Sequence, residues 1–364
     1  MATEGQVRSD LPIPPGELLA ETLEATNLSQ AELARRMGRP IQAINEIVRG
    51  TKEITPETAI QLERVLGVPA HIWLGLEAEY QHTKARLVDR KRLEGEANLP
   101  IVKLLYRPLA RWGWLPRTRS KATQVAHLLD FFGVGSLDKV PVAEPAAYRL
   151  SRTRRARPEA LAAWLRKGEL EARKIETAPF SEKRLHEFLP ELRRLTLKAP
   201  AVFEHRVKKA LADCGVALVL LPHLPKSHAH GATRWLSPEK ALVQLSLRGK
   251  WADIFWFSLF HELGHVLLHG RKRVYIEWPD GRQDELEVEA DRFARDQLIP
   301  PDAYQAFLDP GDFATRAVAA FARNQRIHVG VVVGRLQHEG HIAYSQLNDL
   351  RTRFEWVEKR DQAA

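Results

Sequence analysis

Cysteine pairs and long apolar runs are missing from this sequence, and no secretory signal is expected. Cys214 is the single cysteine among 364 residues, so an internal disulfide is excluded and any metal site has to use histidine and carboxylate ligands. No segment reaches the roughly 18 consecutive apolar residues that a membrane-spanning helix needs, and the first residues, MATEGQVRSDLPIPPGE, contain no apolar signal core. We therefore expect a cytoplasmic protein with no membrane partner.

Length and charge suggest several domains with different partners. A chain of 364 residues is too long for one ordinary domain and fits two or three. Its net charge of +9 is uneven, because the first hundred residues carry 12 Lys/Arg against 15 Asp/Glu and the next hundred carry 21 against 10. The basic run SRTRRAR, from Ser151 to Arg157, fits a solvated helix face and a phosphate-contacting surface equally well.

Local start and stop signals divide the N-terminal part into short helices. Ser29 stands at an N-cap position before AELARRM, Glu32 occupies the capping-box position, and Gly38 ends that helix. Further helices are predicted over 41–49 and 55–66. The charged stretch that follows, HTKARLVDRKRLEGE, is predicted to continue as an exposed helix.

Strands are predicted only in the second half of the chain. Runs rich in leucine and β-branched residues predict three strands over 216–221, 232–236 and 241–247, and after Gly249 the pattern is helical almost to the end. The expected fold class is mainly α with a small β-sheet, of the α+β type. We expect a helix-turn-helix bundle over 1–82, a basic helical linker region over 83–198 and an α+β domain over 199–364.

The most informative segment is FWFSLFHELGHVLLHG. His261 and His265 stand four residues apart, so in a helix their imidazoles project from one face and can hold one Zn²⁺. Glu262 lies beside that face, where it can act as a general base towards water. Burying two histidines and a glutamate in this apolar helix costs several kcal/mol unless a metal partners them. The alternative, two core histidines with local hydrogen bonds, is favoured less.

A third ligand is expected from the next acidic helix, DELEVEADRFARDQLIP. Its candidates are Glu285, Glu287 and Glu289. Glu287 shares a face with small and apolar residues that suit packing on the HExxH helix, whereas Glu289 lies about 200° away on the helical wheel and is the weaker choice. Asp291 could accept the free ring N–H of a ligating histidine. Two histidines, one glutamate and a position left for water form the pattern of a catalytic zinc site.

HELGH followed by E-x-E-A-D-x-F-A-x-x-x-L-I-P resembles the ImmA/IrrE family of metallo-endopeptidases, whose members cut helix-turn-helix repressors. The resemblance covers about residues 200–345. It implies that His261, His265 and Glu287 bind zinc and that Glu262 is the general base, and the pattern is intact at these positions. The α+β domain is therefore expected to be a zinc metallo-endopeptidase with a repressor or antitoxin-like protein as its substrate.

Other residues near the motif carry weaker signals. His269, one more turn along the helix, is interpreted as structural rather than as a fourth ligand, which would close the site. The family resemblance also implies an edge strand at 231–235 or 243–247 that could pair with an extended substrate peptide. Candidates to stabilise an oxyanion are His228, His230, His338, His341 and Tyr344.

The segment SQAELARRMGRPIQAINEIVRG has the layout of a helix-turn-helix, with two helices joined by a short turn that contains glycine. Its polar face, on which Ala43 and Glu46 are also placed, suits base edges and phosphates, because Gln and Asn pair with adenine and Arg with guanine or phosphate. The expected partner is a double-stranded DNA operator, bound by a homodimer since one module reads half a site. The candidate contacts are Gln30, Arg39, Gln42, Asn45, Arg49, Thr51 and Lys52.

Together with ITPETAIQLERVLGVPAHIWLGLEAEY, this part resembles the HigA-like antitoxin branch of the Xre family over about residues 10–85. Two functions stay open. One is a regulator that binds an operator and also cleaves a protein in a stress or toxin–antitoxin circuit. The other is a transcription factor or antitoxin whose metal fold serves as a sensor or partner-binding module. The intact Glu262 favours the first.

Overall fold

The computed structural model describes residues 11–143, 146, 157–247, 250–277 and 285–356. Most of the basic run 151–157 therefore lies outside the described residues. The chain forms two compact units, one of residues up to 98 with 118–126 and one of residues 99–117 with the chain from 127 onward. The fold is mainly helical with one small sheet, which confirms the expected α+β class. Within the described residues, no helix is long and apolar enough to cross a membrane.

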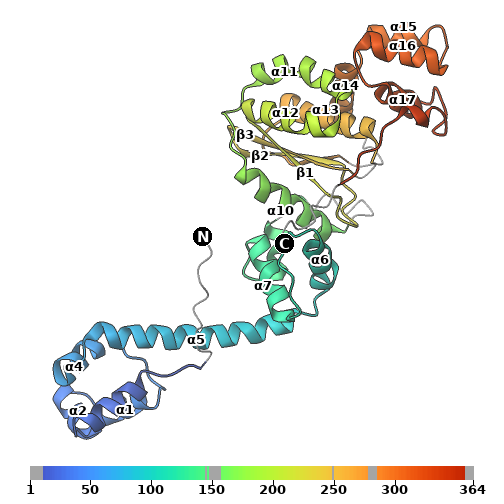
Figure 1. The fold of residues 1–364 in the computed structure, drawn as a ribbon. Helices are drawn as coiled ribbons and strands as arrows, with labels where there is room; N and C mark the ends of the chain where they lie inside the picture. Colours follow the sequence, from blue (N-terminus) through green and yellow to red (C-terminus); the bar gives the residue numbers. More distant parts are fainter. Residues whose placement is uncertain (1–10, 144–145, 147–156, 248–249, 278–284, 357–364) are drawn as a thin grey trace. The chain divides into compact units, whose positions relative to one another are not determined.

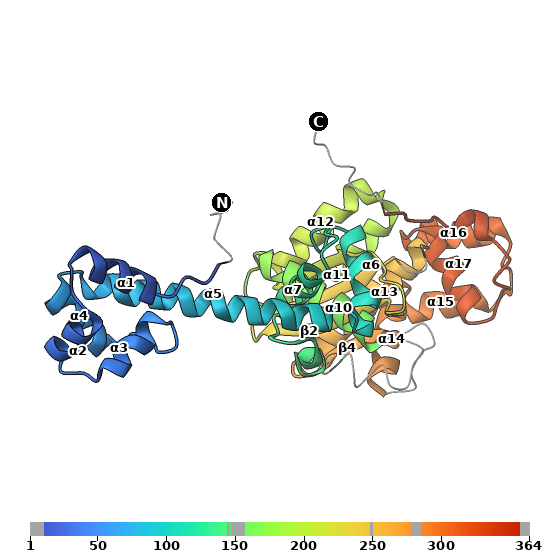
Figure 2. The same ribbon diagram turned by 90° about the horizontal axis from the view of Figure 1, so that it is seen from below.

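The N-terminal unit is a bundle of short helices followed by the long helix α5 (Ala70–Glu96). Figures 1 and 2 show the short helices gathered at the N-terminal end of α5. Leu19, Leu33, Ile44 and Trp73 are fully buried between them, and each such side chain contributes about 1.5–3 kcal/mol on burial. The short helices are α1 (Gly16–Ala25), α2 (Gln30–Met37), α3 (Ile41–Val48) and α4 (Pro56–Leu66).

Local capping sets both ends of α2. The Ser29 hydroxyl accepts a hydrogen bond from the Glu32 backbone N–H at 3.1 Å, which satisfies one of the free donors at the start of α2. Gly38 ends the helix in a left-handed conformation with φ of 65°, which suits glycine because it has no Cβ. The predicted cap and stop of this helix are both confirmed.

The second unit is built from many helices around one sheet. The boundary between the units falls inside α7 (Lys121–Phe132). The remaining α-helices are α6 (Pro100–Arg111), α8 (Val140–Ala143), α10 (Pro158–Lys174), α11 (Glu182–Arg194), α12 (Pro200–Asp213), α13 (Ala252–Leu268), α14 (Glu285–Leu298), α15 (Pro301–Leu308), α16 (Thr315–Gln325) and α17 (Val329–His338). Short 3-10 turns are η1 (Leu137–Lys139), η3 (Leu195–Leu197) and η4 (Asn348–Leu350).

The sheet has the strand order β1-β3-β2-β4. Strand β3 runs parallel to β1 and antiparallel to β2, and β2 pairs with the short β4. The three predicted strands are present, but the expectation of helix almost throughout the chain after Gly249 missed β4. The strands are β1 (Val216–Leu221), β2 (Gly231–Ser237), β3 (Lys240–Ser246) and β4 (Tyr275–Glu277).

An edge strand that could pair with a substrate peptide was expected at 231–235 or at 243–247. The second expectation is wrong, and the first holds only for the part of β2 that β4 does not cover. Strand β3 lies inside the sheet, and β4 covers β2 from Gly231 to Thr233. Among the described strands, β4 is therefore the outer one on this side. Sequence alone could not show this, because a strand of three residues has too few positions for a period-2 pattern.

Helices cover both faces of the sheet (Figure 1). Helix α10 packs on β1 and β3 from one side, while α12 contacts β1 and α13 contacts β2 and β3 from the other. The sequence predicted a linker region over 83–198. This range includes α10, which packs on the sheet of the second unit. Helix α13 also packs against α14 and α17, and Trp256 and Phe260 are among its fully buried side chains. This position explains why α13 is apolar on most sides.

Candidate metal centre and DNA-contact surface

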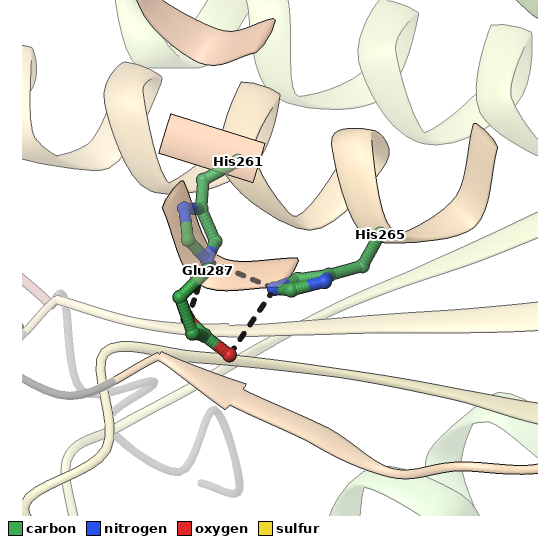
Figure 3. A group of neighbouring side chains, drawn as sticks. All are labelled: His261, His265 and Glu287. Carbon is green, nitrogen blue, oxygen red and sulfur yellow. Dashed lines mark hydrogen bonds and ion pairs between the residues drawn. The ribbon is translucent and has the colours of Figure 1, made fainter. Parts of the chain in front are cut away.

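Three side chains from two packed helices converge in the second unit. His261 and His265 project from α13, and Glu287 reaches them from the first turn of α14 (Figure 3). His261 Nε2 lies 3.0 Å from His265 Nε2 and 3.3 Å from Glu287 Oε2. His265 Nε2 lies 3.6 Å from Glu287 Oε1. The spacing of four residues within one helix and the packing of the next helix together create this cluster.

The three ligand atoms fit a tetrahedral zinc site. They lie within 4.8 Å of one another. Atoms that are each 2.0–2.1 Å from a tetrahedral zinc ion lie about 3.3 Å apart, which is close to the 3.0 Å between the two imidazole nitrogens and the 3.3 Å between His261 Nε2 and Glu287 Oε2. Two imidazole nitrogens and one carboxylate oxygen are also the donors that zinc prefers, and three protein ligands leave the fourth position open.

Asp291 supports His261 from behind. Its Oδ1 lies 2.8 Å from His261 Nδ1, the nitrogen that faces away from the cluster. Burial opposes a charge on His261, but hydrogen bonds to Asp291 and Glu287 raise the pKa of this imidazole well above its usual value. Burial also opposes ionisation of Glu287, yet hydrogen bonds to both histidines lower its pKa to about 2. The Glu287 carboxylate therefore stays ionised next to the imidazoles, which favours a cation at this position.

Glu262 lies on the same helix but is turned towards strand β2. Its side chain is fully buried, and its Oε2 accepts a hydrogen bond from the Thr233 hydroxyl at 2.6 Å. Its Oε1 has no hydrogen-bond partner among the described residues, and burial raises the pKa of Glu262 well above its usual range. A Cβ at Gly231 would come within 2.3 Å of this oxygen, so glycine at that position makes room for the carboxyl group.

Sequence reasoning missed Glu277, a further carboxyl group at the site. It extends from β4 and accepts a hydrogen bond from the Ser258 hydroxyl at 2.9 Å, while its Oε2 is buried without a partner among the described residues. Burial raises the pKa of Glu277 to about 6. Only the position of β4 next to α13 could have revealed this residue, and that strand was not predicted.

The other acidic candidates of α14 do not join the cluster. Of Glu285, Glu287 and Glu289, only Glu287 belongs to the group that can hold an ion. Glu289 instead contacts His269, with 3.1 Å between Oε2 and Nε2. His269 Nδ1 in turn lies 2.7 Å from His265 Nδ1, so His269 is placed behind the cluster, as a residue that contacts a candidate ligand. Burial lowers the pKa of His265 to about 4, which favours the neutral ring that a metal requires.

A cavity of about 290 Å³ opens beside the cluster. Its wall includes the candidate ligands His261 and Glu287 as well as Glu277, but Glu262 is not among its lining residues. Three of the five proposed oxyanion candidates, His230, His338 and Tyr344, also line it. The other two, His228 and His341, do not, and the His341 ring packs on aromatic side chains instead. Apolar lining residues are Ile254, Phe257, Leu298, Ile299 and Val331.

The helix-turn-helix presents most of the predicted DNA contacts at its surface. Gln42, Arg49, Thr51 and Lys52 are exposed, and Asn45 is half-buried. Ala43 was placed on the same face from sequence, but it is buried between the helices, so that assignment is wrong. The remaining two candidates, Gln30 and Arg39, are half-buried.

Some of the polar side chains on this surface already contact other residues of the bundle. Arg39 Nε donates to Gln61 Oε1 of α4 at 2.5 Å, so this arginine is partly engaged within the bundle. Glu46 lies 3.6 Å from the ammonium of Lys52 and accepts a hydrogen bond from the Gln42 amide at 3.4 Å. The negative charge of Glu46 is therefore partly balanced by its own neighbours, which reduces the repulsion it would exert on DNA.

Family models match both regions. A helix-turn-helix model matches residues 19–73, and a model of the IrrE N-terminal-like domain, which defines a peptidase family, matches residues 253–326. The chain joins an Xre-like helix-turn-helix domain to an IrrE-like domain. The first match ends inside α5, and the second contains the three clustered residues together with Glu262 and Asp291.

Relatives of known sequence cover the helix-turn-helix domain. The chain is 34% identical over 80 residues to an uncharacterized HTH-type transcriptional regulator, YddM of Escherichia coli, which spans 22% of this chain and 85% of the relative. It is 39% identical over 75 residues to virulence-associated protein I of Dichelobacter nodosus, which spans 20% of this chain and 69% of that protein. The first of these relatives agrees with the family model in placing the N-terminal region in the helix-turn-helix family.

Solved structures that match the same region include the Pseudomonas aeruginosa antitoxin HigA with the higBA promoter. The match is 36% identical, covers 24% of this chain and 95% of that chain, and has a TM-score of 0.23. A HigA-family addiction module antidote protein from Coxiella burnetii matches at 34% identity over 23% of this chain and 94% of that chain, with a TM-score of 0.22.

Proposed function

We propose that the chain is a DNA-binding transcriptional regulator whose IrrE-like domain is a zinc-dependent endopeptidase. The observation that carries the enzymatic half is the convergence of two imidazole nitrogens and the Glu287 carboxylate, with separations of 3.0–3.6 Å, beside a cavity that His261 and Glu287 line. The substrate class that the family suggests is a repressor or antitoxin-like protein. The resulting circuit would be of the stress-response or toxin–antitoxin type.

In this mechanism each residue has a separate task. His261, His265 and Glu287 would hold a zinc ion, which when bound would supply a Lewis acid towards the peptide carbonyl. Asp291 fixes the orientation of the His261 ring. Glu262 accepts a proton from the attacking water and returns it to the amine leaving group. Its unpartnered Oε1 is the atom that supports this assignment.

The enzymatic half is tested by digestion with the purified full-length protein. Zinc content is measured first, and the helix-turn-helix proteins encoded next to its gene are then incubated with the protein, with and without a chelator. Glu262→Gln should lower the cleavage rate by about 10²–10⁴-fold and retain zinc. Glu285→Gln, which removes an exposed carboxylate of α14, is the control and should cleave as the wild type does. Equal processing by the wild type and Glu262→Gln would exclude the enzyme.

The DNA-binding half rests on the exposed face of α3 and the loop after it. We propose that Gln42, Asn45 and Arg49 read base edges, that Gln30, Arg39, Thr51 and Lys52 contact phosphates, and that a homodimer occupies two half-sites. Gln42→Ala combined with Arg49→Ala should cost about 1–3 kcal/mol per lost base contact. The measurement is a binding titration and footprint on DNA upstream of the gene. Arg64→Ala, on the exposed side of α4, is the control and should bind normally.

One observation favours a second candidate, in which the IrrE-like domain senses or binds a partner without turnover. Glu262 is fully buried, does not line the cavity and is held by Thr233. A general base has to reach the reacting water. In this case the wild type would bind zinc and operator DNA but cleave none of the proteins encoded next to its gene. Cleavage that depends on Glu262 would exclude this second candidate.

A further inference from the structure

The rear side of His265 is contacted by a second histidine and, beyond it, by a carboxylate. His265 Nδ1 lies 2.7 Å from His269 Nδ1, and His269 Nε2 lies 3.1 Å from Glu289 Oε2. Both rings are buried and pack against the Tyr275 ring of β4, at centroid distances of 4.4 Å and 5.5 Å. Glu289 ends this series of contacts at the surface, with 59% of its side chain exposed.

The direction of these hydrogen bonds follows from the requirement for a free Nε2 on His265. A neutral imidazole has one N–H donor and one acceptor nitrogen. If His265 Nε2 is to offer its lone pair to a metal, its proton is on Nδ1 and donates to His269 Nδ1. His269 then carries its own proton on Nε2, which donates to Glu289. The reverse direction would put a proton on His265 Nε2 and prevent it from binding a metal.

The two ligand histidines therefore differ in how their tautomers are fixed. His261 contacts Asp291 directly, and an ionised carboxylate only accepts, so a single contact determines where the His261 proton lies. His269 can donate or accept through Nδ1, so its contact with His265 alone determines nothing. Glu289 supplies the missing constraint, because as an acceptor it draws the His269 proton to Nε2.

We propose that His269 and Glu289 are positioning residues that hold His265 in the tautomer with a free Nε2 and thereby set the zinc affinity of the cluster. This inference rests on the zinc site of the proposed function, but it requires no peptide cleavage. Neither residue touches the ion or the substrate in this scheme. Their effect is exerted entirely through the His265 ring.

The test measures tautomer and zinc affinity separately on the full-length chain. Long-range ¹H–¹⁵N spectra of the metal-free, histidine-labelled protein report which ring nitrogen of His265 carries the proton. Glu289→Ala should populate both tautomers and weaken zinc binding by about 10- to 100-fold, measured by competition with a chromophoric chelator. Glu289→Gln keeps an acceptor oxygen and should recover part of the affinity. Glu285→Ala removes an exposed carboxylate from the same helix and should change neither quantity.

A second variant guards against a purely structural effect. His269→Phe keeps a ring of similar shape against Tyr275 but removes both hydrogen bonds, so it should weaken zinc binding at least as much as Glu289→Ala. The inference is overturned if Glu289→Ala leaves the His265 tautomer and the zinc affinity unchanged, or if Glu285→Ala weakens binding equally. If the wild type binds no zinc, the proposed function fails, whereas the tautomer comparison still decides whether Glu289 fixes the His265 ring.

Discussion

The helix-turn-helix bundle and the candidate metal centre are assembled in opposite ways. In the bundle, two helices start and stop at signals at their own ends, α2 at Ser29 and Gly38 and α4 at Thr55 and Gly67. At the metal centre, the groups come from α13, α14, β2 and β4, and Thr233 lies 29 residues before its partner Glu262. Local chemistry thus determines the first region, and long-range packing determines the second.

This difference leads to different sources of stability. The bundle encloses its own apolar core around Trp73 and Leu33. The metal centre instead places Glu262, Glu277, Glu287 and Asp291 around two imidazoles, an arrangement that a divalent cation would stabilise. We therefore expect changes at the metal centre to leave the stability of the helix-turn-helix bundle unchanged. Changes in the bundle should likewise leave the stability of the metal centre unchanged.

Removal of the metal should separate the two regions most clearly. A ligand at about 1,000 times its dissociation constant stabilises the folded state by about 4 kcal/mol, so chelation should lower the free energy of unfolding of the IrrE-like domain by that order. Calorimetry with and without chelator measures the effect, and operator binding reports on the other region. Loss of operator binding on chelation would show that the regions are coupled.

A smaller effect is expected from the pH dependence of Glu277. Burial raises its pKa from 4.5 to about 6, so the folded state holds this proton more tightly than the unfolded state does. Protonation of Glu277 therefore contributes about 2 kcal/mol to the free energy of unfolding. This contribution is complete below pH 4.5 and is lost as the pH rises through 6. In the metal-free protein, Glu277→Gln should therefore gain about 2 kcal/mol of stability over the wild type across this window, measured by denaturant unfolding. Glu79→Gln, exposed on α5, should show no such gain.

The sequence predicted those parts of the site that lie on helices. A spacing of four residues places His261 and His265 on one face of α13, and the same periodicity selected Glu287 and Asp291 over Glu289 on α14. These predictions needed only the geometry of a helix and the assumption that the two helices pack together. Helix ends in the N-terminal bundle were predictable for the same reason, since caps act locally.

The parts of the site that depend on strand pairing could not be predicted. Glu277 and Tyr275 reach the metal centre because β4 pairs with β2 across more than 40 residues of chain, and three residues carry no usable periodicity. Likewise, the contact of Thr233 with Glu262 depends on how α13 lies over the sheet. Spacing showed that His269 is one turn beyond His265, but it could not show that their Nδ1 atoms meet.

The smallest expected effects come from two matched helix caps, one in each unit. Ser29 accepts a hydrogen bond from the Glu32 N–H at 3.1 Å, and Ser181 accepts one from the Arg184 N–H at 3.3 Å at the start of α11. Replacing such a cap by alanine costs about 1 kcal/mol. Ser29→Ala should lower only the stability of the helix-turn-helix and Ser181→Ala only that of the IrrE-like domain, as followed by hydrogen exchange of amides in each unit. If either substitution destabilised both units equally, they would unfold as one cooperative body, and the contrast between a locally determined and a long-range region would not extend to their stability.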